Sequence, residues 1–180
     1  RERGFVEITA PVLTPLPLYD DGTALAVDVK GDNVFLTQCV GYYLEAAVHA
    51  FERVYNMGPS FRGEESRSRR HLMEYWHIKA EVAFATLEDA MHLVEEFVSD
   101  IIRKCAEQAG SILPIIGTEL CMDGTNPPFP RITYREAVAR LQERGYPFKI
   151  GDGLGSEEEE ILSQEFEKPF WIVGIPRTLE

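Results

Sequence analysis

The chain has 180 residues, 44% of them hydrophobic, with a formal net charge of −12 at pH 7 and a pI of about 4.8. These values are typical of a globular protein with a sizeable core. They provide no long-range attraction for nucleic acid, so any RNA contact would depend on a local basic patch. No apolar run approaches membrane-spanning length, no signal-peptide pattern opens the chain, and the three cysteines are scattered without a CxxC pair. We therefore expect a cytoplasmic protein with reduced thiols and no membrane contact.

The first part of the chain is predicted to contain short strands and one helix. Residues 4–13 alternate apolar and polar side chains around a proline, which indicates an edge strand, and residues 13–24 are rich in Pro, Asp and Gly, which indicates a loop. A short strand is expected at 33–39. From Tyr42 to Tyr55 the apolar positions recur at helical spacing, so we predict an amphipathic helix there.

Residues 59–84 are predicted to form a long antiparallel hairpin in the centre of a sheet. A strand over 58–65 is followed by the arginine-rich loop 66–70 and by an alternating strand over 71–84. Because side chains on a strand alternate between its faces, this second strand has one polar and one apolar face. The polar face carries Tyr75, His77, Lys79 and Glu81. The apolar face, which we expect in the core, carries Trp76, Ile78, Val82 and Phe84.

Helix-start signals dominate the second half of the chain. Thr86 with Asp89 and Thr133 with Glu136 have the spacing of capping boxes, and a run of glutamates after Ser156 favours another helix start. The remaining segments are a loop with strand fragments at 111–132 and a buried strand at 168–176. Together these elements predict an α+β fold, an antiparallel sheet flanked by helices.

The charge pattern of the hairpin fits a ligand that combines phosphates with a polar ring. Arg62 and Glu64 share one face of the first strand, and Tyr75 is on the polar face of the second. An arginine matches a phosphate with two parallel donors, a carboxylate can accept from an exocyclic amine, and an aromatic ring can stack on a base. A nucleoside triphosphate is the simplest such ligand. The alternative is a solvated charged surface with no ligand, and the pattern alone leaves both open.

Two segments resemble a known family. Residues 61–81, FRGEESRSRRHLMEYWHIKAE, resemble motif 2 of the class II aminoacyl-tRNA synthetases of the aspartyl, asparaginyl and lysyl subgroup. Residues 1–13, RERGFVEITAPVL, resemble motif 1, with Pro11 at the position of its proline. Residues 42–64 and 127–138 look most like the asparaginyl branch. The resemblance covers nearly the whole chain, so we expect residues 1–180 to form one synthetase-like catalytic core.

This resemblance implies an enzyme that uses ATP and Mg²⁺ to activate a carboxylate as an adenylate, a homodimer formed through residues 4–13, and tRNA as a possible partner of the full-length protein. It also implies residue roles. Arg62 would bind the α-phosphate and stabilise the charge that develops as the carboxylate attacks. Glu64 would accept from the adenine amine, Arg70 and His71 would reach the β- and γ-phosphates, and Tyr75 would stack on adenine.

Two parts of the family pattern have no counterpart in this sequence. Residues 1–180 contain neither the glycine-rich motif 3, with its second ATP-binding arginine and the carboxylates that would hold magnesium, nor the anticodon-binding barrel that is N-terminal to motif 1 in this subgroup. We therefore expect the catalytic core to be incomplete at its C-terminus.

The expected amino-acid pocket departs from the family pattern at several positions. Asp20 or its neighbour replaces a glutamate that meets the substrate amino group, and Gly41 replaces a glutamine. Glu45, which would read the side-chain amide, is kept, whereas Lys79 replaces an acid two residues before Glu81. A lysine at this point would repel a substrate ammonium. Either Lys79 pairs with Asp20 or Glu81, or the substrate differs from a standard amino acid.

The resemblance therefore favours an asparaginyl-tRNA-synthetase-like enzyme and leaves two alternatives open. One is a stand-alone paralogue that passes its adenylate to ammonia, a small molecule or a protein instead of tRNA. The other is a degenerate, non-catalytic dimeric domain. For either enzyme, the changes at Asp20, Gly41 and Lys79 predict a carboxylate substrate that differs from asparagine and aspartate or is held differently.

Overall fold

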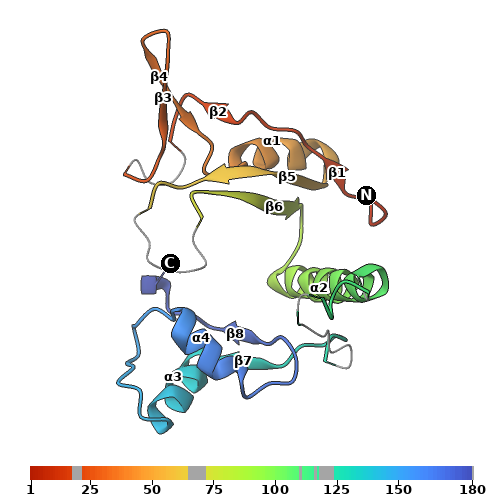
Figure 1. Ribbon diagram of the computed structural model, residues 1–180, viewed down its shortest axis with the longest axis vertical. Helices are drawn as coiled ribbons and strands as arrows, with labels where there is room; N and C mark the ends of the chain where they lie inside the picture. Colours follow the sequence, from red (N-terminus) through yellow and green to blue (C-terminus); the bar gives the residue numbers. More distant parts are fainter. Residues whose placement is uncertain (18–21, 65–71, 110, 116, 118–123, 180) are drawn as a thin grey trace. The chain divides into compact units, whose positions relative to one another are not determined.

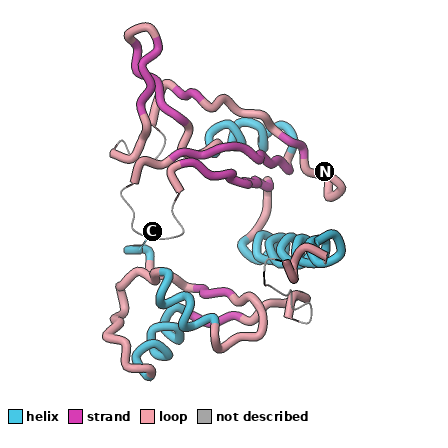
Figure 2. Tube along the Cα trace, in the orientation of Figure 1, coloured by secondary structure: helices cyan, strands magenta, loops and turns pink. Residues whose placement is uncertain are grey.

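The computed structural model describes residues 1–17, 22–64, 72–109, 111–115, 117 and 124–179, which form two compact units, Arg1–Ala85 and Thr86–Glu180 (Figure 1). The first unit contains β1 (Val6–Glu7), β2 (Leu13–Thr14), β3 (Ala26–Val29), β4 (Asp32–Leu36), α1 (Gly41–Phe51), β5 (Arg53–Phe61) and β6 (Glu74–Val82). The second contains α2 (Leu87–Ala109), β7 (Arg131–Thr133), α3 (Tyr134–Glu143), α4 (Ser156–Ser163), β8 (Trp171–Val173) and the short 3₁₀ helix η1 (Arg177–Leu179). Figure 2 shows this mixture of helices and strands, and the predicted α+β class is confirmed.

The predicted hairpin is present. β5 and β6 pair antiparallel from Arg53 opposite Val82 to Phe61 opposite Glu74, and β1 pairs parallel with β5 through Val6 and Val54. The order of this sheet is β1-β5-β6. Among the described residues β5 is therefore central and β6 is at the edge, so the predicted central position applies only to the first strand of the hairpin.

The helix predicted from Tyr42 to Tyr55 ends earlier. α1 stops at Phe51, and Glu52 turns the chain with a φ of 59°, a conformation that few residues other than glycine adopt. Val54, which fits the helical spacing, is fully buried in β5 between β1 and β6. Pairing with two strands that are distant in sequence therefore outweighs the local helical pattern.

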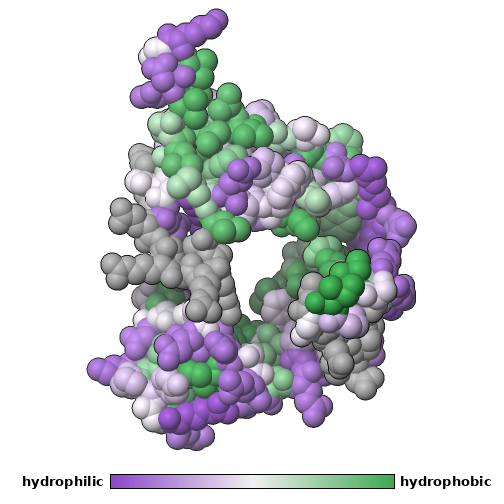
Figure 3. All heavy atoms as spheres, viewed as in Figure 1, coloured by the Kyte–Doolittle hydropathy of each residue, from purple (hydrophilic) through white to green (hydrophobic). Residues whose placement is uncertain are grey.

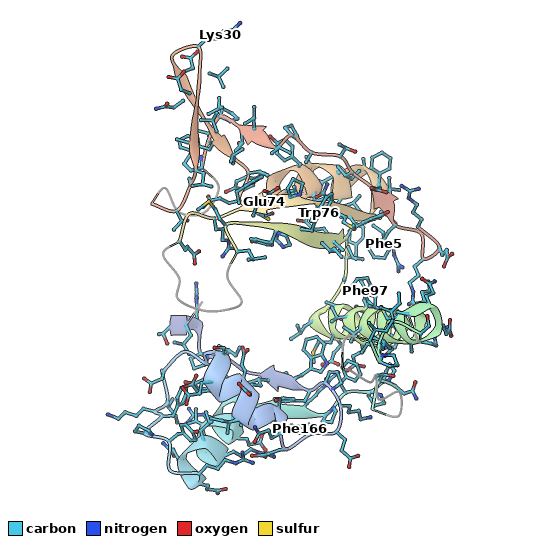
Figure 4. All side chains as sticks on the ribbon, in the orientation of Figure 1. Phe5, Lys30, Glu74, Trp76, Phe97 and Phe166 are labelled. Carbon is cyan, nitrogen blue, oxygen red and sulfur yellow. The ribbon has the colours of Figure 1, made fainter. Side chains whose placement is uncertain are left out.

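A second sheet, of order β2-β4-β3, was only partly predicted. The strand expected at 33–39 is shorter, because β4 ends at Leu36, and β3 was not predicted. β3 and β4 are joined by Lys30 and Gly31, which have φ angles of 58° and 95°, as a two-residue type I′ hairpin turn requires. Lys-Gly is a weaker turn signal than Asn-Gly. Hydrophobic residues lie along this hairpin and hydrophilic ones at its tip (Figure 3), where Lys30 is labelled in Figure 4.

The second unit has its own hydrophobic core and both predicted capping boxes. Its core is formed by buried residues of α3, α4, β7 and the loop between the helices: Ile132, Tyr134, Ala137, Val138, Leu141, Phe148 and Leu162. Thr133 accepts from the Glu136 backbone N–H at 3.2 Å, and Glu136 accepts in return from the Thr133 N–H at 2.6 Å. Thr86 and Asp89 make the same reciprocal contacts before α2, at 2.8 and 3.2 Å. The strand predicted at 168–176 is β8, which is half-buried and pairs parallel with β7.

Candidate active site

The polar face of the β5–β6 hairpin lies beneath α1. On β6 this face carries Tyr75, His77, Lys79 and Glu81, all half-buried. The residues opposite them on β5 are Ser60, Gly58, Asn56 and Val54. Leu44 of α1 packs against Val54 from this side, and the Lys79 ammonium reaches the Cys39 sulfur just before α1. The start of α1 and the segment that leads into it therefore cover the polar face.

The apolar face of β6 is exposed, so its predicted place in the core is wrong. Trp76 is 69% exposed, Ile78 52% and Phe84, beyond the end of β6, 95%, whereas Val82 is half-buried. Trp76 is labelled on β6 in Figure 4. Hydrophobicity predicted burial for this face, but in the first unit α1 packs on the opposite one. The polar residues are consequently the more enclosed, which is unusual for a structural surface and typical of a binding site.

Arg62 and Glu64 come together at the open end of this face. The Arg62 N–H donates to the Met73 carbonyl at 2.9 Å, which extends the hairpin pairing beyond β5. Its guanidinium lies 3.5 Å from the Glu64 carboxylate, and both side chains are exposed. Ion pairs of this kind contribute little to stability, so a ligand can replace either partner at small cost.

Gly63 explains how these two side chains lie beside residues 23–25. Its N–H donates to the Thr23 carbonyl at 2.8 Å. A Cβ at this position would lie 2.9 Å from a methyl carbon of Leu25 and 3.2 Å from the Thr23 oxygen, which is too close. The glycine therefore allows the backbone between Arg62 and Glu64 to contact the segment that follows residue 21.

His77 occupies the middle of the polar face, and no role was predicted for it. Its Nδ1 lies 3.2 Å from the Ser60 hydroxyl, and its ring centroid lies 5.8 Å from that of Tyr75. Burial lowers the pKa of the His77 imidazole below its ordinary value of 6.5, and the positive charges of Lys79 and Arg62 lower it further. A neutral imidazole therefore lies between two cations. The alternation that places it between Tyr75 and Lys79 is the sequence signal that could have identified it.

Replacing His77 with glutamine should make folding stability less dependent on pH between about pH 7 and pH 5. Because the folded-state pKa of His77 is lowered, the unfolded chain takes up a proton at this residue before the folded chain does. The parent protein therefore loses stability as the pH falls through the unfolded-state pKa, and the variant lacks this contribution. Urea unfolding of both proteins across this range measures the difference. An equal loss of stability in both would contradict the shift.

Lys79 pairs with Glu81 and lies close to the start of α1. Its ammonium is 3.6 Å from the Glu81 carboxylate and 3.6 Å from the Cys39 sulfur, which in turn accepts from the Gly41 N–H at 3.3 Å. The ion pair with Glu81 is one of the two alternatives that the sequence left open. Glu45 is exposed on α1, one helical turn after Gly41 and so on the same side of the helix.

Buried polar contacts fix the segment that leads into α1. Thr37 and Gln38 are almost fully buried. The Thr37 carbonyl accepts from the Phe61 N–H at 2.9 Å at the end of β5, and the Gln38 amide donates to the Thr23 hydroxyl at 2.9 Å. These bonds tie the chain before Gly41 to the strand that leads to Arg62. The remaining predicted site residues, Asp20, Arg70 and His71, lie outside the described residues.

Comparison with known proteins identifies the family. A family model described as tRNA synthetases class II (D, K and N) matches residues 1–180. The chain therefore belongs to this family, as its resemblance to motifs 1 and 2 predicted. Among curated relatives, the asparagine–tRNA ligase of Pyrococcus abyssi is 36% identical over 178 residues, and that of Koribacter versatilis is 40% identical over 183 residues. These alignments cover 98% and 97% of this chain but 41% of each relative, so the chain spans about two fifths of their length.

Solved structures agree with this assignment. The crystal structure of asparaginyl-tRNA synthetase from Pyrococcus horikoshii complexed with asparaginyl-adenylate matches with a TM-score of 0.92 and 36% identity, over 99% of this chain and 42% of that one. The Entamoeba histolytica asparaginyl-tRNA synthetase in complex with asparaginyl-adenylate matches with a TM-score of 0.86 and 25% identity, over 99% and 40% of the two chains. The synthetase-like fold is therefore confirmed. In the described part of the chain, no helix is both long and apolar enough to cross a membrane.

Proposed function

We propose that this chain is part of a catalytic core that activates a carboxylate with ATP, forming an acyl-adenylate and releasing pyrophosphate. The observation that carries the proposal is the enclosed polar face of β5–β6, with Arg62 and Glu64 at its open end and Tyr75 beside them. The relatives named as asparagine–tRNA ligases, and the matching structures with bound asparaginyl-adenylate, support the same chemistry. The family match over 1–180 supports our treating both units as parts of one core.

Arg62 has the central role in the proposed reaction. A carboxylate oxygen of the substrate attacks the α-phosphorus of ATP, and the bond from that phosphorus to the oxygen of the leaving pyrophosphate breaks. The Arg62 guanidinium exchanges Glu64 for the α-phosphate and stabilises the charge that develops there, while Glu64 accepts from the adenine amine. Tyr75 stacks on the adenine ring. Such catalysis depends on positioning and electrostatic stabilisation and needs no protein nucleophile.

The other predicted residues complete the proposed site. Arg70 and His71 would contact the β- and γ-phosphates. Substrate-binding residues would be Asp20, Glu45, Lys79 and Glu81. Mg²⁺ would accompany ATP, but the described residues contain no group of three or more His, Cys, Asp or Glu side chains that could hold a metal ion, so we assign no residue to it.

ATP–pyrophosphate exchange by the full-length protein tests this function. Exchange that depends on an added carboxylic acid supports adenylate formation, and its absence with every acid in a broad panel would contradict it. Subsequent transfer to tRNA would support a tRNA ligase. Exchange without transfer would support an enzyme with another acceptor, and neither activity would support a non-catalytic domain.

The proposal includes a cytoplasmic homodimer that forms through residues 4–13. This segment exposes the apolar side chains of Val6, Val12 and Leu13, which a twofold interface would bury. We expect the full-length protein to sediment as a dimer at micromolar concentration. Replacing Leu13 with aspartate should shift it toward monomer, because a buried carboxylate would be repeated across the twofold axis. A parent protein that sediments as a monomer would contradict this interface.

A further inference from the structure

We infer that His77 is a positioning residue of the proposed nucleotide site: the buried Ser60 hydroxyl holds its imidazole beside Tyr75, and the imidazole keeps the Tyr75 ring in the orientation that stacks on adenine. This inference rests on the proposed function, in which Tyr75 contacts the base. It goes further by giving a role to His77 and Ser60, two residues to which the family resemblance assigned none.

Ser60 provides a fixed anchor for the imidazole. The residue is 1% exposed and lies on β5, which is held on both sides at this point. β6 pairs with Ser60 on one side, and on the other the Phe61 N–H donates to the Thr37 carbonyl at 2.9 Å. A buried hydroxyl requires a hydrogen-bond partner, and the His77 Nδ1 lies 3.2 Å from the Ser60 Oγ. This contact therefore restrains the rotation of the imidazole.

The register of the hairpin directs the imidazole toward Tyr75. The residue opposite His77 is Gly58, which has no side chain to hold it, whereas Ser60 is opposite Tyr75 and so diagonal to His77. Diagonal neighbours on paired strands are within reach of long side chains. Residues two apart on a strand are separated by about 6.6 Å, and the ring centroids of Tyr75 and His77 lie 5.8 Å apart. The two rings therefore lean toward each other.

The two rings form a tilted pair. Their planes make an angle of 42°, and aromatic rings attract each other over centroid separations of about 4.5 to 7 Å. Within the described part of the chain, no other ring pair includes Tyr75. The imidazole therefore restrains the Tyr75 ring before a nucleotide binds. Restraining a side chain in advance strengthens binding, because less freedom is lost when the ligand arrives.

The charge state of His77 favours this role over direct binding of a phosphate. Burial lowers the pKa of the imidazole, and the positive charges of Lys79 and Arg62 lower it further. The imidazole is therefore neutral at pH 7. It lacks the positive charge with which Arg62 would bind a phosphate, so its contribution to the nucleotide site is its contact with Tyr75.

Calorimetric titration of the full-length protein with ATP tests this inference. His77→Ala should weaken ATP binding roughly three- to tenfold, the effect of one aromatic contact, and Ser60→Ala should weaken it about threefold, the effect of one hydrogen bond. In a Tyr75→Ala background each should change binding by less than about twofold, because the ring that they position is then gone. Ile78→Ala is the matched control, since Ile78 follows His77 on β6 but is exposed on the opposite face.

Inorganic tripolyphosphate separates positioning of the base from general loosening of the hairpin. It carries the phosphates of ATP without the adenine, so its affinity should be the same in the parent protein and in His77→Ala. If His77→Ala weakened ATP and tripolyphosphate equally, the hairpin as a whole would be disturbed and the inference would be wrong. Should His77→Ala fail to fold, Ser60→Ala, which removes a single oxygen, decides by the same criteria.

Other results separate this inference from the proposed function. Unchanged ATP binding in His77→Ala, or equal losses in the parent and Tyr75→Ala backgrounds, would overturn the inference and leave adenylate formation in place. A parent protein that binds no ATP would contradict both. ATP binding with the expected dependence on His77 and Tyr75, but without pyrophosphate exchange with any acid, would support the inference and contradict the proposed reaction.

Discussion

Replacing Arg62 with alanine is expected to lower ATP–pyrophosphate exchange by the full-length protein roughly 30- to 900-fold, the equivalent of about 2 to 4 kcal/mol of transition-state stabilisation. Arg62 is exposed at the end of the polar face, and its contact with Glu64 is a weak surface pair. The loss should therefore appear in the reaction and not in folding. Exchange kinetics, measured with urea unfolding of the same variant, separate the two effects.

Arg53 provides a matched control for this experiment. It is an arginine at the other end of β5, nine residues before Arg62, so its side chain lies on the opposite face of the strand. There its guanidinium lies 5.9 Å from the centre of the Phe5 ring. We expect Arg53→Ala to change exchange by less than about threefold, since an exposed cation–π contact contributes only modestly to stability. If the two variants have the same activity, the role proposed for Arg62 is wrong.

Replacing Leu44 with alanine should cost about 2 to 5 kcal/mol of the stability of the first unit. Leu44 is fully buried and packs with Val40 and Val54, so its truncation leaves a cavity between α1 and β5. Because α1 covers the polar face at this point, the change should also loosen the segment next to Lys79. Hydrogen exchange followed by mass spectrometry should show faster exchange in peptides from α1 and β5.

Leu141 is the corresponding control in the second unit. It is also fully buried, within the core formed by α3, α4 and β7. Leu141→Ala should cause a loss of similar size, with faster hydrogen exchange confined to peptides after residue 86. If both variants accelerated exchange uniformly over the whole chain, the division into two separately packed units would not describe its stability.

Local signals predicted the elements whose structure depends on local contacts. The hairpin follows from strand alternation on either side of a charged loop, and the capping box at Thr133 joins residues three apart. The end of α1 and the exposure of Trp76 were mispredicted because both depend on distant segments. Pairing with β1 and β6 turns residues 53–55 into a strand, and the position of α1 decides which face of the hairpin is covered.

The candidate site shows the same division. Arg62, Glu64 and Tyr75 were predicted because a sequence motif carries them and a single hairpin presents them. The contact between His77 and Ser60 could not be predicted, because it requires the packing of one strand on another. The close approach of Gly41 to Lys79 could not be predicted either. Nothing in the sequence shows that the missing side chain at residue 41 makes room for the lysine nitrogen.

The close approach of Gly41 to Lys79 also makes the conformation of the lysine depend on the missing side chain at residue 41. A lysine in the observed conformation fits only while residue 41 has no side chain, since a Cβ there would lie 2.6 Å from the lysine nitrogen. A larger residue at 41 would move the flexible end of Lys79 to another conformation, at little cost to folding. Reversion of Gly41 would therefore relocate the charge and leave the fold in place.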